Sequence, residues 1–199
     1  MPNQPTKDRF SDPTVVFRNE LAKIKTTSVK RAVLWMLRKS PEEFWYAPSS
    51  YSGRYHSPDE FGIGGQVLHT KRVFYQAMVL SDAAYEEMDT TDRDILYAAA
   101  LVHDTLAGST GSGDHVSTFV EYYYDRDYTH ELIVSLICQA VEQHAGRWTP
   151  EPLKLTSYTE EMEFIQTLLH YADMIATKNN STHILKEKDY PLPKPTGKW

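Results

Sequence analysis

The sequence predicts an all-α protein, and three observations favour this fold class. In each long segment outside the loops, apolar residues recur at the spacing of three and four that one face of a helix requires. No stretch alternates apolar and polar residues over a useful length, as a half-buried strand would. The 199 residues, 41% hydrophobic and 24% charged, suit one globular domain. We therefore expect a single-domain helical bundle of roughly six to eight helices.

Three regions are expected along the chain. Residues 1–12 are polar and predict a flexible tail, residues 13–185 carry the helical pattern, and residues 186–199 are a second tail rich in proline and lysine. The N-terminus lacks the apolar core of a secretory signal, and no stretch is as long as a membrane span. A single cysteine, Cys138, excludes an intramolecular disulfide. These features predict a cytoplasmic protein that does not associate with membranes.

The first part of the domain combines a helical segment with a long loop. Residues 14–39 predict one or two helices with a basic, solvated face. Residues 47–66 are dominated by Pro, Ser and Gly and predict a loop. This loop exceeds the length of about 15 residues beyond which connections are usually functional or disordered.

Helical periodicity then marks four further segments. A Gly/Ser loop at residues 106–114 lies between the second segment and the third. Asp92 or Thr91 is expected to cap the second segment, and Thr159 stands at the start of the last. The second is nearly all apolar, which predicts a central, buried helix. The four segments cover residues 67–78, 95–102, 132–141 and 164–175.

Several polar residues lie on the apolar faces of these helices. His103 and Asp104 directly follow the alanine-rich segment, where burial of an unpaired carboxylate would be costly. His69, His144 and Asp173 each share a face with apolar neighbours three or four positions away. Taken singly, such a residue is more often a hydrogen-bonded core residue than a ligand. Taken together, they predict a metal site, and imidazole with carboxylate suits Mn, Fe, Ni, Co or Zn.

The order of these residues resembles the signature of the HD superfamily of metal-dependent phosphohydrolases. His69, then the pair His103-Asp104, then Asp173 follow that signature, and HYADMIAT around Asp173 is similar to its last motif. The segment SSYSGRYH…GGQVLHTK resembles the loop and first-helix motif of one branch, of which some members are linked to exoribonucleases. The resemblance covers residues 45–180. It implies an HD-type bundle with a central metal site.

The resemblance also implies a ligand set and catalytic roles. His103 and Asp104 would be catalytic, and one or two divalent ions would be bound, with Mg also admissible. His115 and His144 match the two histidines that hold a second ion in many HD proteins, with Asp104 bridging the ions. His130 is the alternative to His115. The implied metal ligands are His69, His103, Asp104, His115, His144 and Asp173.

One departure from the common HD pattern limits which branches of the superfamily the chain resembles. Many HD proteins read His-Asp-Ile-Gly-Lys, whereas this chain reads HDTLAGST and lacks the lysine. This argues against the large signalling and cyclic-dinucleotide branches. His170, one helical turn before Asp173, is either an outer partner of the site or a packing residue.

The expected function is hydrolysis of a nucleotide or related phosphate ester by metal-activated water. The net charge of −6 disfavours an RNA or DNA end as substrate, and a homo-oligomer stays open. Lys71 and Arg147 could equally be exposed, and Arg54 could pair with Asp59 or Glu60. The candidates for substrate binding are Arg54, Tyr55, His56, Lys71 and Arg147.

Two other functions remain open from the sequence. A minority of HD proteins use the same six ligands for a mixed-valent di-iron centre and are oxygenases. A non-catalytic, nucleotide-binding regulatory module could also keep the ligands for structure. The ligand set alone does not separate these functions from hydrolysis.

Overall fold

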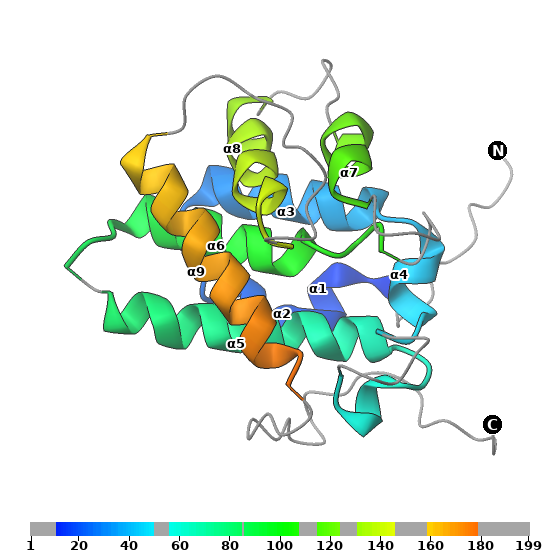
Figure 1. Cartoon of the computed structure of the whole chain (residues 1–199). Coiled ribbons are helices and arrows are strands. Elements are labelled where there is room, and N and C mark those ends of the chain that lie inside the picture. The colour runs from blue at the N-terminus through cyan, green and yellow to red at the C-terminus, as the bar shows by residue number, and fades with distance from the viewer. Residues whose placement is uncertain are drawn as a thin grey trace, which may run out of the picture.

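The computed structural model describes residues 11–49, 56–84, 86–107, 115–123, 131–145 and 159–178, with side chains of the fourth and fifth ranges from residues 118 and 132. Within these ranges the protein is entirely helical and contains no strand (Figure 1), which confirms the predicted all-α class. None of the described helices is both long and apolar enough to span a bilayer.

The described part of the chain contains nine α-helices and a 3₁₀ helix, η2. Six of the nine have nine or more residues, and the other three have only four or five. A helix of one turn is too short to show periodicity, so α4 could not be predicted from the sequence pattern. The bounds are α1 Pro13–Val16, α2 Arg18–Leu21, α3 Thr27–Lys39, α4 Glu42–Tyr46, η2 Pro58–Glu60, α5 Gly65–Ala83, α6 Thr90–Val102, α7 His115–Tyr123, α8 Glu131–Glu142 and α9 Glu160–Ala176.

Helix α6 is the centre of the bundle. Every residue from Asp94 to Val102 is buried, as its apolar sequence predicts. Helices α3, α5, α8 and α9 all pack against α6, and α9 crosses in front of α5 and α6 (Figure 1). Asp94 joins α6 to α3, because its carboxylate accepts hydrogen bonds from the backbone N–H groups of Lys25 and Thr26. The C-terminal end of α6 therefore lies inside the bundle, close to α5, α8 and α9.

Helix starts agree with the sequence in one case and differ in another. Thr159 caps α9 through a hydrogen bond from the Met162 N–H. Helix α6 is capped by Asp89, not by Asp92 or Thr91, and Asp92 is instead the third helical residue of a capping box with Asp89. The box extends the helix by one turn beyond its apolar stretch, which periodicity cannot reveal.

Two glycines with different requirements begin α5. Gly64 has a φ of 75° in the left-handed region, which glycine adopts without strain. Gly65 is needed for space, because a Cβ there would lie 1.8 Å from the carbonyl oxygen of Glu60. Ser49 donates its backbone N–H to the same carbonyl. Ser49 and Glu60, in the described parts of the predicted loop, therefore lie directly against the start of α5.

The first half of α5 is buried on all sides, including two charged residues. The ammonium group of Lys71 donates to the Val16 carbonyl at 2.6 Å and to Glu20 at 3.0 Å. It also lies 5.1 Å from the centre of the Phe17 ring. Lys71 therefore fixes the N-terminal helices to α5.

Two apolar residues counted in the helical pattern are not in the core. Leu132 is 72% exposed, and Ile175 is 40% exposed. Their helices form as predicted over α8 and α9, so periodicity located the helices better than it located the edges of their buried faces.

Candidate metal centre

The structure brings together five of the six expected ligands at the C-terminal end of α6. His69 comes from α5, His103 and Asp104 follow α6, His144 follows α8, and Asp173 comes from α9. The Nε2 atoms of His69 and His103 lie 3.1 and 4.0 Å from Asp173 Oδ1. Ligand atoms that share one ion at about 2.0–2.2 Å are separated by about 3 to 4.4 Å, depending on the angle between them, so this spacing suits a metal site.

Two of the histidines are oriented by the backbone of their own helix ends. His103 Nδ1 lies 3.0 Å from the Ala100 carbonyl, and His144 Nδ1 lies 2.7 Å from the Val141 carbonyl. Carbonyls in the last turn of a helix lack the usual amide partner four residues later, so they can accept a side-chain donor. The Val141 carbonyl accepts the backbone N–H of His144 as well as the ring. If Nδ1 carries the proton, Nε2 is left as the ligand atom on both rings.

Two of the ring nitrogens at the centre lack a partner that would explain them without an ion. Nε2 of His69 and Nε2 of His103 are buried and have no hydrogen-bond partner. His69 Nε2 is only 3.1 Å from Asp173, yet the two are not aligned as a hydrogen bond. Atoms that are close but do not point at each other are expected where both point at a common ion. The residues present therefore fit a divalent metal ion.

The carboxylates dominate the protonation of this cluster. Burial lowers the pKa of His103, but Asp104, Asp173 and the Ala100 carbonyl together outweigh burial and raise that pKa to about 9. Burial likewise lowers the pKa of His69, and the contact with Asp173 reverses this and gives a net rise. Burial raises the pKa of Asp173, and His69 brings it below the ordinary value. The metal-free cluster therefore binds protons that a metal ion would have to displace.

Asp104 is held by a residue that the sequence did not single out. Gln66 Nε2 donates to Asp104 Oδ2 at 3.0 Å, and Asp104 Oδ1 lies 3.4 Å from His144 Nε2. Gln66 stands three residues before His69 in the first turn of α5, so it faces the same side. Its place in GGQVLH was the available signal. The amide fixes which oxygen of Asp104 faces His144.

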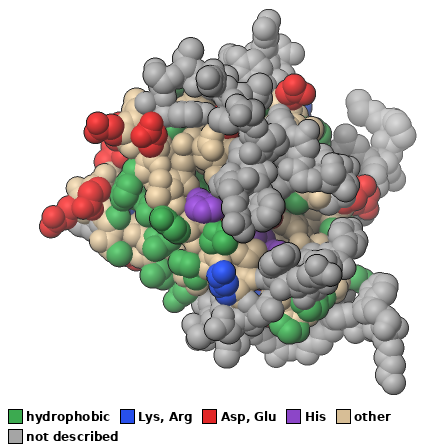
Figure 2. All heavy atoms as spheres, in the orientation of Figure 1, with side chains coloured by type: hydrophobic (Ala, Val, Ile, Leu, Met, Phe, Trp, Pro, Cys, Tyr) green, Lys and Arg blue, Asp and Glu red, His purple; other side chains and the backbone are tan. Residues whose placement is uncertain are grey.

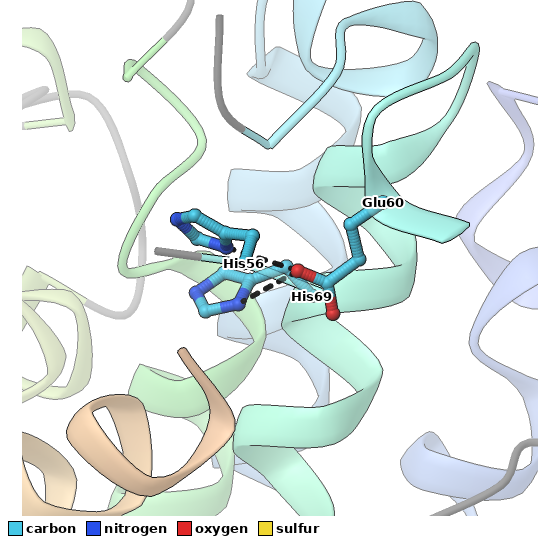
Figure 3. Close-up of side chains that lie close together, drawn as sticks. All are labelled: His56, Glu60 and His69. Atoms are coloured by element: carbon cyan, nitrogen blue, oxygen red, sulfur yellow. Dashed lines mark hydrogen bonds and ion pairs between the residues drawn. The ribbon is translucent and has the colours of Figure 1, made fainter. Parts of the chain in front are cut away.

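A second cluster adjoins the first and shares His69 with it. His56 and Glu60 approach His69 from the loop before α5 (Figure 3). Glu60 Oε2 lies 2.9 Å from His56 Nδ1 and 3.7 Å from His69 Nδ1, while Glu60 Oε1 pairs with Arg72. Arg72 also contacts Asp59 at 2.5 Å. Asp59 and Glu60 are the possible partners of Arg54 in the sequence, and both pair with Arg72, one turn after His69.

The other expected residues have varied placements. The expectation that Lys71 binds substrate is wrong, because its ammonium group is buried against Val16 and Glu20. His170 donates from Nδ1 to the His144 carbonyl at 2.7 Å, so it contacts the backbone of an expected ligand. His115 begins α7, but its side chain lies outside the described residues. Also outside them are Arg54, Tyr55, His130 and Arg147.

Part of the centre is accessible to solvent. The side chains of Asp104 and Asp173 are each 16% exposed, and His56 is 12% exposed. Figure 2 shows histidine at the surface near the middle of the face that α9 crosses, bordered by hydrophobic side chains. A small molecule could therefore reach the carboxylates while His69, His103 and His144 stay buried.

Comparison with known proteins identifies one family. The family model described as HD domain matches residues 67–178, more than half of the chain. No curated protein and no solved structure matches the chain. The matched region contains His69, His103, Asp104, His144 and Asp173, and it begins after His56 and Glu60. The resemblance to one branch rests largely on residues before this region and stays a prediction.

Proposed function

Because the chain belongs to the HD domain family, whose members are mostly metal-dependent phosphohydrolases, we propose that it hydrolyses a phosphate ester or anhydride of a nucleotide or related compound. One observation carries the proposal: the unpartnered Nε2 atoms of His69 and His103 converge with the carboxylate of Asp173. A buried cluster of this composition is costly unless a cation completes it. We infer that a divalent metal ion does so.

The residues divide between two ions. His69, His103, Asp104 and Asp173 would hold the first, and His115 and His144, with Asp104 shared, would hold a second. A bound divalent transition metal such as Mn, Fe, Co, Ni or Zn, or Mg, supplies a water that ionises near neutral pH and positive charge for phosphate oxygens. The donor set of imidazole nitrogen and carboxylate oxygen is compatible with each of the transition metals.

The chain's own residues would position the reacting groups. Gln66 holds Asp104 in one orientation, and the Ala100 and Val141 carbonyls hold His103 and His144. His56, partly exposed beside His69, is the described residue best placed to contact a substrate phosphate. In our proposal, Arg54, Tyr55 and Arg147 complete the substrate site.

Charge favours a small substrate. Both cations described in the buried part of α5, Lys71 and Arg72, are already paired with carboxylates. The net charge of the chain is −6. Binding a long polyphosphate backbone requires many free cations, whereas one or two phosphates can be neutralised by metal ions and a few side chains. We therefore favour a nucleotide over an RNA or DNA end.

The test begins with metal-free full-length protein reloaded separately with Mn²⁺, Fe²⁺, Co²⁺, Zn²⁺ or Mg²⁺. Each form is incubated with nucleoside mono-, di- and triphosphates, and released phosphate is measured. We expect turnover with at least one transition metal and none with Asp104→Ala. Oxygen uptake by the iron form without phosphate release would replace hydrolysis by oxygenase chemistry. Tight nucleotide binding without turnover would indicate a regulatory module instead.

A further inference from the structure

His69 differs from the other two described histidines of the site in its position within its helix. His103 and His144 lie at helix ends, where a carbonyl three residues earlier accepts from Nδ1. His69 is the fifth residue of α5, and inside a helix the backbone carbonyls already accept amide hydrogen bonds. The carbonyl of Gln66, three residues before His69, also accepts the Thr70 hydroxyl. A partner for His69 Nδ1 must therefore come from outside its own helix.

The nearest acceptor is the carboxylate of Glu60. Glu60 is completely buried, and its Oε2 lies 3.7 Å from His69 Nδ1 across the gap drawn in Figure 3. His69 Nδ1 is buried with no hydrogen-bond partner at this separation. A small rotation of the ring would close the gap to hydrogen-bond length. Glu60 therefore stands where the Ala100 and Val141 carbonyls stand for the other two rings.

Residues of the loop and of α5 together fix the position of Glu60. Arg72 and His56 bind the two carboxylate oxygens, and Ser49 binds the backbone carbonyl. Gly65 lets that carbonyl approach α5 more closely than any side chain would allow. A buried ion pair such as Glu60–Arg72 adds little net stability compared with apolar packing. Its geometry therefore calls for an explanation other than stability.

A different role for these residues is a separate cation site formed by His56, Glu60 and His69. The protonation of the His69 ring argues against a separate cation site. A neutral imidazole has one nitrogen available as a ligand, so His69 can serve either this cluster through Nδ1 or the cluster with His103 and Asp173 through Nε2. The Arg72 guanidinium already neutralises Glu60 and would repel a cation. The positive charge of Arg72 and the single proton of the neutral His69 ring both favour Glu60 as a hydrogen-bond acceptor and not as a metal ligand.

We propose that Glu60, held by Arg72, is a positioning residue that accepts a hydrogen bond from His69 Nδ1–H and so presents Nε2 to the metal ion. The inference rests on the metal site of the proposed function but not on its reaction. Residues 56 and 60 lie before the region matched by the HD family model. In metal sites, loss of such an outer partner typically weakens metal binding by about 10–100-fold.

The first measurement uses the unaltered full-length chain loaded with Zn²⁺, which is diamagnetic. Nitrogen-15 spectra of the histidine side chains report which ring nitrogen is protonated, with His69→Gln used to assign the signal. We expect His69 to carry its proton on Nδ1 and to bind zinc through Nε2. Zinc bound to Nδ1 of His69 would overturn the proposal.

The second measurement compares Glu60→Gln with Asp59→Asn by zinc titration against a competing chelator. Both changes remove a carboxylate from Arg72, but Asp59 is 44% exposed, whereas Glu60 is buried beside His69. We expect Glu60→Gln to weaken zinc binding by about 10–100-fold at unchanged stoichiometry, and Asp59→Asn to leave it unaltered. An unchanged affinity in Glu60→Gln, equal losses in both variants, or loss of one whole ion in Glu60→Gln would each contradict the proposal.

These outcomes are separable from failure of the proposed function. If the chain binds zinc as described but releases no phosphate from any nucleotide, the function is wrong and the role of Glu60 stands. If Glu60→Gln does not fold, the spectrum of the unaltered chain still decides the tautomer of His69.

Discussion

The metal centre has two halves that are built in different ways. In the helix-end half, His103 and His144 are held by carbonyls three residues earlier in the same chain segment. In the loop half, His69 faces Glu60, which is nine residues away and depends on Arg72 for its own position. The first half needs only a helix that ends at the right residue. The second needs a folded loop, a buried ion pair and a glycine at a close contact.

The two kinds of hydrogen-bond acceptor, backbone carbonyl and side-chain carboxylate, differ in how easily an amino-acid substitution removes them. The backbone carbonyls of Ala100 and Val141 are present whatever side chains those residues carry, so point substitutions rarely remove them. The acceptor on the loop side is a side chain, and a single substitution can remove it. We therefore expect the two halves to contribute equally as ligands but unequally as supports, and the following predictions test this from the largest effect to the smallest.

Removal of a ligand should have the largest effect and should be equal in both halves. His69→Ala and His103→Ala each delete one nitrogen that lies within 4.0 Å of Asp173 Oδ1. We expect each to weaken Zn²⁺ binding by more than the roughly 100-fold limit for outer partners. Elemental analysis and chelator competition measure this loss. Retention of full metal content in either variant would show that the site is misassigned on that side.

The pH dependence of zinc binding should be the next largest effect. The pKa of metal-free His103 is raised to about 9, so below that pH a proton must leave before Nε2 can bind. Each displaced proton makes the apparent affinity rise about tenfold per pH unit, up to about pH 9. Competition with a chelator of known protonation constants checks this between pH 7 and 9. The control is His170→Gln, which removes a histidine whose ring is hydrogen-bonded to the His144 carbonyl. In this variant the zinc affinity should rise with pH at the same slope as in the unaltered chain.

The same pKa shift predicts the opposite trend for the stability of the metal-free chain. Because the folded pKa of His103 lies above its unfolded value of 6.5, the stabilisation is complete below pH 6.5 and is lost as the pH rises towards 9. The melting temperature of the metal-free protein should therefore fall over the range in which zinc affinity rises. A flat profile for both quantities would contradict the protonation described for the helix-end half.

Two glycine variants probe the loop half. Gly65→Ala places a Cβ 1.8 Å from the Glu60 carbonyl, whereas a Cβ at Gly62 meets nothing within 4 Å. Alanine normally favours a helix, so a loss of stability must come from the clash. We expect Gly65→Ala to destabilise by about 1–3 kcal/mol in chemical denaturation and to weaken zinc binding, with Gly62→Ala unchanged in both. Destabilisation of Gly65→Ala with normal zinc affinity would uncouple the loop from the metal site.

The sequence predicted the helix-end half far better than the loop half, and the reason is the range of the contacts. A histidine after an apolar helix is visible in the sequence, and its carbonyl partner follows from helix geometry. The contacts of Glu60 with His56, His69 and Arg72 depend on how a loop folds back, which periodicity does not describe. The all-α fold was predictable because the long helices are amphipathic or wholly apolar.

Charged residues in α5 illustrate the same limit. Lys71 was expected near a phosphate or in solvent, because lysine is rarely buried. It is buried because Val16 and Glu20, more than 50 positions earlier, provide its hydrogen bonds. Gln66 was missed for a related reason, since a glutamine in a loop-to-helix motif gives no sign of the carboxylate it will meet. Such partners are set by tertiary packing and not by local pattern.

The smallest expected effect concerns Gln66, which links the two halves of the centre. Gln66 lies on α5 near His69, and its side-chain amide donates a hydrogen bond to Asp104, the neighbour of His103. Gln66→Met keeps the length of the side chain and removes the hydrogen bond, which is worth about 1.5–3 kcal/mol when the acceptor is charged. Part of this is recovered in the loaded site, because the ion itself orients Asp104. We therefore expect zinc affinity to fall by up to about tenfold, measured by chelator competition. Gln166→Met is the matched control, since its amide is also buried but donates to the Gln139 carbonyl and not to a ligand. The control should lose stability to a similar degree and bind zinc normally, and equal affinity losses in both variants would show that Gln66 acts through general packing.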